Sequence, residues 1–276
     1  AKSVSDSLCI TSLRGVDSHG IRLLEHYVNS SLLGRKNPQP KFKFYKNFSS
    51  IGVLDADNGF GHAAGKKAIE YGIKMANKNG IGLISVINSS HCGSLASIAL
   101  DAAFQGYICM AFTHADSLIL PTNAIKPFLG TNPICFVAPR KDEEPYCLDM
   151  SSSKISWNKL LNFKSNNKKL PNDVAANIMG SSTTNPNNAK SLLPFGDYKG
   201  YGMASMIEIL CGIYSGMNYA NQIPAMFTTS LKKTRKLSQM YILIRTDGVI
   251  SKTNFLKRMK NFSKMTRNQK AKKNKK

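Results

Sequence analysis

The chain has 276 residues, 42% of them hydrophobic, and a formal net charge of +22. This length is sufficient for a buried core and for a division into two units. The sequence has no apolar run of roughly 18 residues, and residues 1–11 lack a basic stretch followed by an apolar one. These features argue against a membrane-spanning protein and against an exported one.

The positive charge is concentrated at the C-terminal end. After Glu208, 16 Lys and Arg side chains face a single acid, Asp247, so this part carries +15 of the net charge. A lysine-rich end of this kind either binds RNA, DNA or another anionic surface, or is a solvated segment without stable structure. Because the lysines are not interleaved with aromatic side chains for base stacking, we favour the solvated segment.

Six cysteines are spread along the chain without a CxxC pair. Most of them lie in apolar segments, which is typical of free buried thiols in a reducing compartment. We therefore expect a cytoplasmic protein. The six are Cys9, Cys92, Cys109, Cys135, Cys147 and Cys211.

Helical and strand patterns alternate in the first half of the chain, which favours an α/β fold. Apolar side chains at three- and four-residue spacing predict helices over residues 18–33, 61–79 and 94–105. Short apolar or alternating runs predict strands over residues 42–44, 51–54, 81–87 and 108–112.

The second half is less regular. Residues 162–188 are rich in Asn, Ser, Lys and Pro, and predict an exposed, irregular connection. On either side of it we expect strands over 134–138, 146–150 and 240–245, an apolar helix over 202–217 and a basic helix over 253–265.

The sequence lacks the glycine fingerprint of a Rossmann nucleotide-binding fold. No GxGxxG follows the first strand, and Gly59-Phe60-Gly61 lacks the third glycine. This glycine pair therefore predicts a turn rather than a cradle for phosphate.

Five short polar strings interrupt the apolar sequence and carry a likeness to a known family. In this order and spacing they resemble the type 2 malate/L-lactate dehydrogenases, ureidoglycolate dehydrogenase included, whose members use NAD or NADP on small 2-hydroxy acids. The likeness runs from about Asp17 to Ile244. The strings are Asp17-Ser18-His19-Gly20, Ser89-Ser90-His91-Cys92-Gly93, Gly130-Thr131-Asn132-Pro133, Leu148-Asp149-Met150 and Tyr198-Lys199-Gly200-Tyr201-Gly202.

The resemblance implies an α/β fold with two lobes and a homodimer that needs no metal. Residues 41–190 would form a non-Rossmann lobe that binds the dinucleotide. Residues 1–40 and 191–250 would form a discontinuous helical lobe, and residues 251–276 a basic helix and tail.

It also implies that His91 and His19 exchange the proton that accompanies hydride transfer. An imidazole suits this task because its ordinary pKa of about 6.5 lets it give and take a proton near neutrality. Members of the family differ over which histidine does so, and we rank His91 first. Without the resemblance, His19 would be an ordinary residue at a helix N-terminus and His91 an ordinary loop histidine.

The remaining site residues also follow from the resemblance. Those implied to bind substrate are Ser18, Arg22, Thr131, Asn132 and Arg235. Those implied to bind NAD or NADP are Ala115, Asp116, Asp149, Met150, Ser151, Lys199 and Gly200. A lysine at a glycine-flanked turn suits a phosphate, because the backbone can approach closely there and the ammonium supplies charge.

Two departures from the family leave two hypotheses open. Leu23 stands where the family usually has an arginine, and on a helix the shift to Arg22 turns the side chain by about 100°. After Ile244 the basic tail replaces an expected Pro-Gly-Glu region. The first hypothesis is an oxidoreductase that transfers a hydride between NAD(P) and a 2-hydroxy or 2-oxo acid of the malate, lactate or ureidoglycolate type. The second is an inactive relative whose tail binds nucleic acid or an anionic partner.

Overall fold

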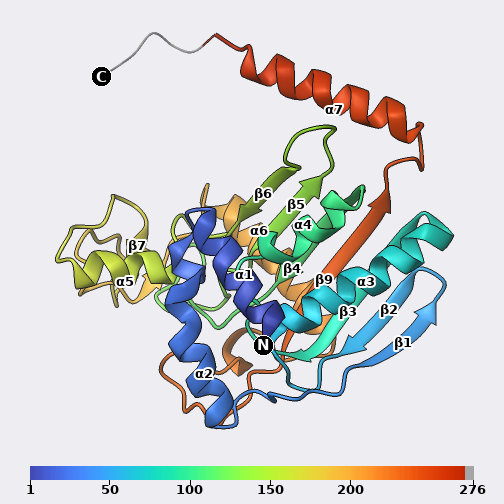
Figure 1. The fold of residues 1–276 in the computed structure, drawn as a ribbon. Helices are drawn as coiled ribbons and strands as arrows, with labels where there is room; N and C mark the ends of the chain where they lie inside the picture. Colours follow the sequence, from blue (N-terminus) through green and yellow to red (C-terminus); the bar gives the residue numbers. More distant parts are fainter. Residues whose placement is uncertain (271–276) are drawn as a thin grey trace.

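A seven-stranded mixed sheet runs through the middle of the molecule (Figure 1). The computed structural model describes residues 1–270. Neighbouring strands are antiparallel except β2 and β3, which are parallel. The expected α/β class is therefore confirmed. In spatial order the strands are β1 (Lys43–Phe48), β2 (Ile51–Asp55), β3 (Ile81–Ser89), β9 (Leu237–Arg245), β4 (Tyr107–Thr113), β5 (Ile134–Ala138) and β6 (Tyr146–Met150).

The central position of β9 corrects the expected division into lobes. This strand pairs with β3 on one side and with β4 on the other. Its side chains Leu237, Met240, Tyr241 and Leu243 are fully buried, as expected of a strand covered on both faces. Residues 237–245 therefore belong to the sheet and not to a helical lobe formed by residues 191–250.

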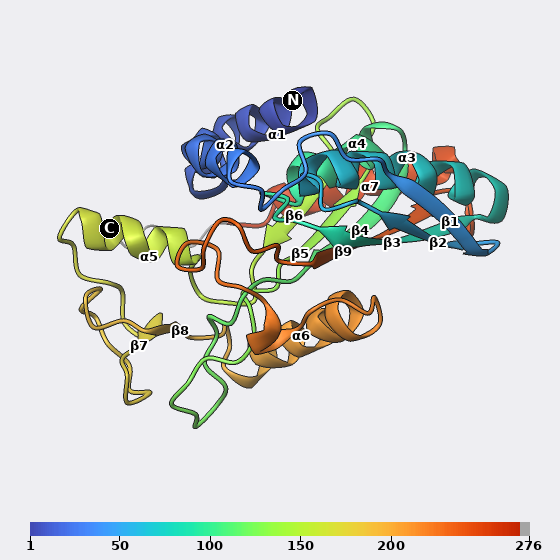
Figure 2. The same cartoon turned by 90° about the horizontal axis from the view of Figure 1, so that it is seen from below.

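Helices cover both faces of the sheet. Figure 2 shows α3 (Gly61–Asn79) and α4 (Ala96–Phe104) on one face and α6 (Tyr198–Glu208) on the other. A Cβ at Gly72 of α3 would collide with Leu243 of β9, so glycine lets this helix lie close to the sheet. Gly80 adopts a left-handed conformation, with φ of 82°, and ends α3 where the sequence predicts.

The predicted helix over residues 18–33 is wrong in its first half. The chain forms α1 (Lys2–Leu13), two 3₁₀ turns around Gly20, and only then α2 (Leu24–Leu32). At Gly20 the backbone is extended, and a Cβ there would collide with Ser12 of α1. The close approach to α1 therefore breaks the helical pattern, and His19 lies on a turn.

Residues 162–188 are mostly exposed and irregular, as predicted, but short regular pieces lie within the segment. The helix α5 (Trp157–Ser165) enters the segment, and β7 (Ala175–Ala176) pairs with β8 (Ser191–Leu192). A small separate core supports this unit, because several apolar side chains within and beside the polar stretch turn inward. Its buried members are Ile155, Leu160, Leu170, Val174, Ala175, Ala189 and Leu192.

The basic helix predicted near the C-terminus is present as α7 (Lys252–Arg267) and stands away from the sheet (Figure 1). None of its residues is buried, and Arg267 pairs with Glu143 at 2.5 Å. The lysines predicted to form a tail lie mostly outside the described residues. Within residues 1–270, no helix combines the length and the apolar character needed to cross a bilayer.

Candidate active site

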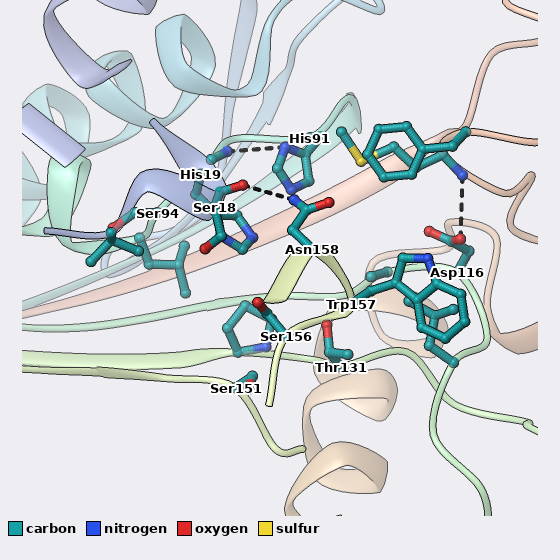
Figure 3. Close-up of a pocket in the computed structure, with 18 of the residues that line it drawn as sticks. Ser18, His19, His91, Ser94, Asp116, Thr131, Ser151, Ser156, Trp157 and Asn158 are labelled. Carbon is teal, nitrogen blue, oxygen red and sulfur yellow. Dashed lines mark hydrogen bonds between the residues drawn. The ribbon is translucent and has the colours of Figure 1, made fainter. Parts of the chain in front are cut away.

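A cavity of about 760 Å³ lies where the N-terminal turns, the sheet and α5 meet (Figure 3). Its volume is in the range of small-molecule and cofactor sites. Ten of the residues assigned from the sequence line it, although they come from widely separated segments. They are Ser18, His19, His91, Ala115, Asp116, Thr131, Asp149, Met150, Ser151 and Arg235.

The two candidate proton carriers lie together in this cavity. The rings of His19 and His91 stack with their centroids 5.7 Å apart and an angle of 24° between the planes. The Ser18 hydroxyl lies 2.9 Å from Nδ1 of His19. Asn158 of α5 donates to the Ser18 carbonyl at 2.7 Å, and so ties the turn that carries His19 to the opposite wall (Figure 3).

His91 is held on one side of its ring. The Tyr27 hydroxyl lies 2.6 Å from Nδ1, and the backbone N–H of Gly93 donates to the same atom at 3.3 Å. Because Nδ1 accepts this N–H, the neutral imidazole carries its proton on Nε2. Nε2 has no partner among the described residues and remains for a ligand in the cavity that His91 lines.

Both imidazoles are kept neutral by their surroundings. Burial lowers the pKa of His19, and only Asp149 opposes this effect. Burial lowers the pKa of His91 well below its usual range, and His19 and Arg235 add to the shift. A neutral His91 can donate a hydrogen bond from Nε2 to a carbonyl oxygen in the cavity.

Arg235 brings a buried cation to the cavity wall. Its Nη2 pairs with Asp116, and its Nε donates to the Pro224 carbonyl at 2.8 Å. Its Nη1 is buried and has no hydrogen-bond partner in the part of the chain that the structure describes. A carboxylate of a bound acid is the natural partner for such a guanidinium.

Asp116 is already engaged by the protein. Besides the pair with Arg235, it accepts the backbone N–H of Met226 at 3.2 Å (Figure 3). Arg35, which is 1% exposed, donates to the carbonyls of Met226, Thr229 and Ser230 at 2.6 to 2.9 Å. Asp116 and Arg35 therefore fix the loop that carries Met226 and Phe227 along the cavity wall.

Asp149 belongs to β6, and its carboxylate lies at the N-terminus of α4. One of its oxygens accepts the hydroxyl of Ser94 at 2.8 Å and the N–H of Ala96 at 2.9 Å, which satisfies the first turn of the helix. Its other oxygen has no protein partner within residues 1–270 and lies in the cavity wall with Met150 and Ser151. A free carboxylate oxygen in the cavity wall suits ribose hydroxyls.

Asn132 does not line the cavity, in contrast to what the resemblance implied. It is fully buried and donates to the Ala204 carbonyl at 2.9 Å and to Glu208 at 2.6 Å. Its own oxygen accepts the N–H of Ala115 at 3.1 Å. All its hydrogen-bonding groups face the protein, so Asn132 braces the neighbouring Thr131 and Ala115, which do line the cavity.

Three further assigned residues also lie outside the cavity lining. Arg22 is exposed and borders an adjoining groove of about 300 Å³, which shares Asn158 and Phe227 with the cavity. Gly200 is buried, and a Cβ there would collide with the Phe195 carbonyl, so this glycine serves close packing. Lys199 is exposed in the first turn of α6.

We expect Lys199→Ala to weaken NADH affinity only slightly, by roughly 0.2–1 kcal/mol, because an exposed charge is well screened by solvent. The effect should disappear at high salt. Titration calorimetry at two salt concentrations would measure it. A larger, salt-independent loss would place Lys199 in direct contact with the cofactor.

Several cavity or supporting residues were not identified from the sequence. Tyr27 falls within the predicted helix over residues 18–33, where its tyrosine ring reads as one more apolar side chain. Arg35, Trp157 and Asn158 lie outside the five polar strings. Arg14 and Lys190 also line the cavity, and nothing in the surrounding sequence singles them out.

Comparison with known proteins agrees with this geometry. Residues 1–276 match the family described as Malate/L-lactate dehydrogenase. A malate dehydrogenase from Pyrococcus abyssi is 38% identical over 233 residues, which is 81% of this chain and 64% of the relative. A ureidoglycolate dehydrogenase (NAD(+)) from Escherichia coli K12 is 31% identical over 244 residues, 88% of this chain and 70% of the relative. The chain thus spans about two thirds of the length of these curated relatives.

The fold is shared as well. The solved structure of a sulfolactate dehydrogenase from Methanocaldococcus jannaschii superposes with a TM-score of 0.91 at 29% identity, covering 99% of this chain and 78% of that one. A malate dehydrogenase from Entamoeba histolytica gives a TM-score of 0.92 at 27% identity, covering 100% and 80%. The match over the whole sequence, together with this shared fold, shows that the chain belongs to the malate/L-lactate dehydrogenase family.

Proposed function

We propose that this protein is an NAD(P)-dependent dehydrogenase that interconverts a small 2-hydroxy acid and its 2-oxo acid. One observation carries the proposal: two stacked imidazoles and a buried arginine with a free Nη1 line the same cavity of about 760 Å³. These groups match what the reduction of a 2-oxo acid needs, namely a proton donor for the carbonyl oxygen and a cation for the carboxylate.

The part of the cavity near α4 suits the dinucleotide. Asp149 and Ser151 offer hydrogen-bonding groups for ribose, and Ala115 and Met150 supply apolar wall. Bound NAD(P)H would supply the hydride that the carbonyl carbon accepts. We propose that the lobe of residues 41–190 holds the cofactor without a Rossmann motif. The N-terminal turns and the loop around Met226 would form the other walls of the cavity.

The part of the cavity between the histidines and Arg235 suits the acid. The Nη1 of Arg235 would pair with the carboxylate, which orients the carbonyl toward the histidines. His91 would take up a second proton from solvent when the carboxylate is bound, so that both ring nitrogens carry a proton. It would then pass the Nε2 proton to the carbonyl oxygen as the hydride reaches the carbonyl carbon, and return to a neutral imidazole. His19, fixed through Ser18 and Asn158, would orient the substrate from the other side.

The substrate is proposed to be of the malate, lactate or ureidoglycolate type, since relatives named for malate, ureidoglycolate and sulfolactate are 38%, 31% and 34% identical to this chain. All of these acids present a carboxylate beside a hydroxyl-bearing carbon. We also propose that the protein acts in the cytoplasm as a homodimer.

Trp157 offers a direct test of cofactor binding, because it is the single tryptophan of the chain and lines the cavity. NADH should quench its fluorescence by energy transfer and should raise the melting temperature of the native protein. In Trp157→Phe the quenching of tryptophan fluorescence should be absent, while NADH should still raise the melting temperature. No change in either quantity would contradict the proposal.

Turnover is tested by supplying 2-oxo acids with NADH or NADPH and following the loss of absorbance. We expect at least one 2-oxo acid to be reduced, with one of the two cofactors preferred. A protein that binds NADH but reduces none of them would be the inactive relative. In that case the position of Arg22 outside the cavity lining, in the adjoining groove, would be the first feature to examine.

A further inference from the structure

A group of buried side chains lies directly behind His91, on the side away from the cavity. Tyr27, 1% exposed, is the centre of this group. His62 packs against it edge to face with centroids 5.1 Å apart, and Phe60 does so at 6.3 Å. Lys36, 2% exposed, extends over the Tyr27 ring from the segment after α2. None of these four residues lines the cavity.

Tyr27 connects this group to His91. The hydroxyl of this buried phenol lies 2.6 Å from Nδ1, which is a short hydrogen bond. A phenol can donate to Nδ1 when the imidazole is neutral and can accept from it when the imidazole is charged. Tyr27 can therefore hold His91 in one orientation through both protonation states, with Nε2 toward the cavity.

The buried amine of Lys36 destabilises the folded protein. Its Nζ lies 3.9 Å from the centroid of the Tyr27 ring and 4.8 Å from that of Phe60. The amine is buried and has no hydrogen-bond partner within residues 1–270. Contact with two ring faces recovers only part of the cost of removing an amine from water. A buried amine retained at such a cost next to a candidate proton carrier indicates a role in the site.

We propose that Tyr27 and Lys36 are positioning residues for the dehydrogenase reaction: the phenol orients His91, and the buried amine holds the phenol in place. This inference rests on the proposed role of His91 in proton transfer. The group acts on the reaction only through His91, because neither Tyr27 nor Lys36 reaches the cavity.

Charge in this group also affects how stability depends on pH. Burial, Arg235 and Arg35 lower the pKa of Lys36 well below its ordinary 10.5. Between the lowered value and 10.5 the unfolded chain binds a proton that the folded chain does not, so stability rises with pH across this window. The charged and titratable groups around Lys36 and His91 are His19, His26, Tyr27, Arg35, His62, Cys92 and Arg235.

Tyr27→Phe tests the orienting role, since it removes the hydroxyl and keeps the ring beneath Lys36. We expect turnover to fall roughly 10- to 100-fold, the usual effect of losing a group that orients a functional histidine. The KM for the 2-oxo acid and the affinity for NADH should stay unchanged. Adding the change to His91→Asn should cause no further loss, because the two residues act as a unit.

A measurement without substrate separates this inference from the proposed function. In the ligand-free protein the Gly93 N–H keeps the same His91 tautomer in wild type and variant, but the Nδ1 NMR signal of His91 should shift in Tyr27→Phe, because the hydrogen bond to the phenol is lost. Tyr241→Phe is the matched control, because Tyr241 is equally buried but bonds Gln239 at 2.7 Å. It should leave the His91 signals unchanged. Unchanged His91 signals in Tyr27→Phe would overturn the inference, whatever the activity.

Lys36→Met tests the buried amine with a side chain of similar length. Removing an unpaired buried amine should raise the melting temperature. It should also reduce the rise in stability with pH that the lowered pKa of Lys36 causes. It should also raise the pKa of His91 and shift the pH profile of turnover in the same direction. If the variant melts lower than the wild type and leaves both the His91 titration and the pH profile unchanged, Lys36 is structural.

Discussion

His91→Asn is expected to retain NADH binding but to lower turnover roughly 10²- to 10⁴-fold, the usual contribution of a positioned acid or base. Asparagine has a similar shape, so the cavity should keep its form. Its amide does not exchange a proton near neutrality, which is the function assigned to Nε2 of His91. Steady-state kinetics and NADH titration on the same preparation would measure both quantities.

His19→Asn should act mainly on the KM for the 2-oxo acid, because its ring stacks on His91 but is held through Ser18 on a separate turn. If His19 is the proton carrier, the two phenotypes exchange, and the pH dependence of turnover disappears in this variant instead. His26→Asn is the comparison variant, since His26 borders the groove around Arg22 and does not line the cavity itself. Because its ring reaches the cavity only through Phe227, it should change turnover much less than either of the other variants.

Asp116→Ala is expected to destabilise the protein by roughly 3–5 kcal/mol, the cost of leaving one member of a buried ion pair alone. Arg235, 3% exposed, would lose its partner, and the N–H of Met226 would lose its acceptor. Affinity for the 2-oxo acid should fall because Arg235 is no longer held. Affinity for NADH should stay near that of the wild type. Denaturant titration and ligand titration would measure these effects.

The double variant Asp116→Ala with Arg235→Met separates stability from binding. Removing both charges should recover much of the lost stability, since an apolar side chain avoids an unpaired buried charge. Substrate affinity should remain low, because the guanidinium is absent. If Asp116→Ala instead melts like the wild type and loses NADH affinity, Asp116 is a cofactor ligand, as the family resemblance implied.

Local patterns in the sequence determined most of the elements. The apolar period over residues 61–79 gave the bounds of α3, and two apolar runs gave those of β5 and β6. Helix period and turn chemistry act over a few residues, so they can be recognised without knowing the fold. The same reasoning was wrong around Gly20, where contact with α1 overrides the helical period.

The polar strings identified which segments meet in the cavity, but not how each residue is used. The strings that contain His19, His91, Thr131 and Asp149 do come together. Asn132 and Gly200, within strings of the same kind, face the protein interior instead. Which side of a turn faces a ligand depends on the elements packed against it, and no neighbour in the sequence specifies that.

The sequence by itself therefore determined the α/β class, the family and the segments that build the cavity. Only the tertiary structure decided the placement of β9 in the middle of the sheet and the contacts that hold the site. Tyr27 meets His91 across 64 positions, Asp116 meets Arg235 across 119, and Arg35 meets Met226 across 191. Such contacts form when packing brings distant segments together, whereas periodicity and turn preferences act only between residues a few positions apart.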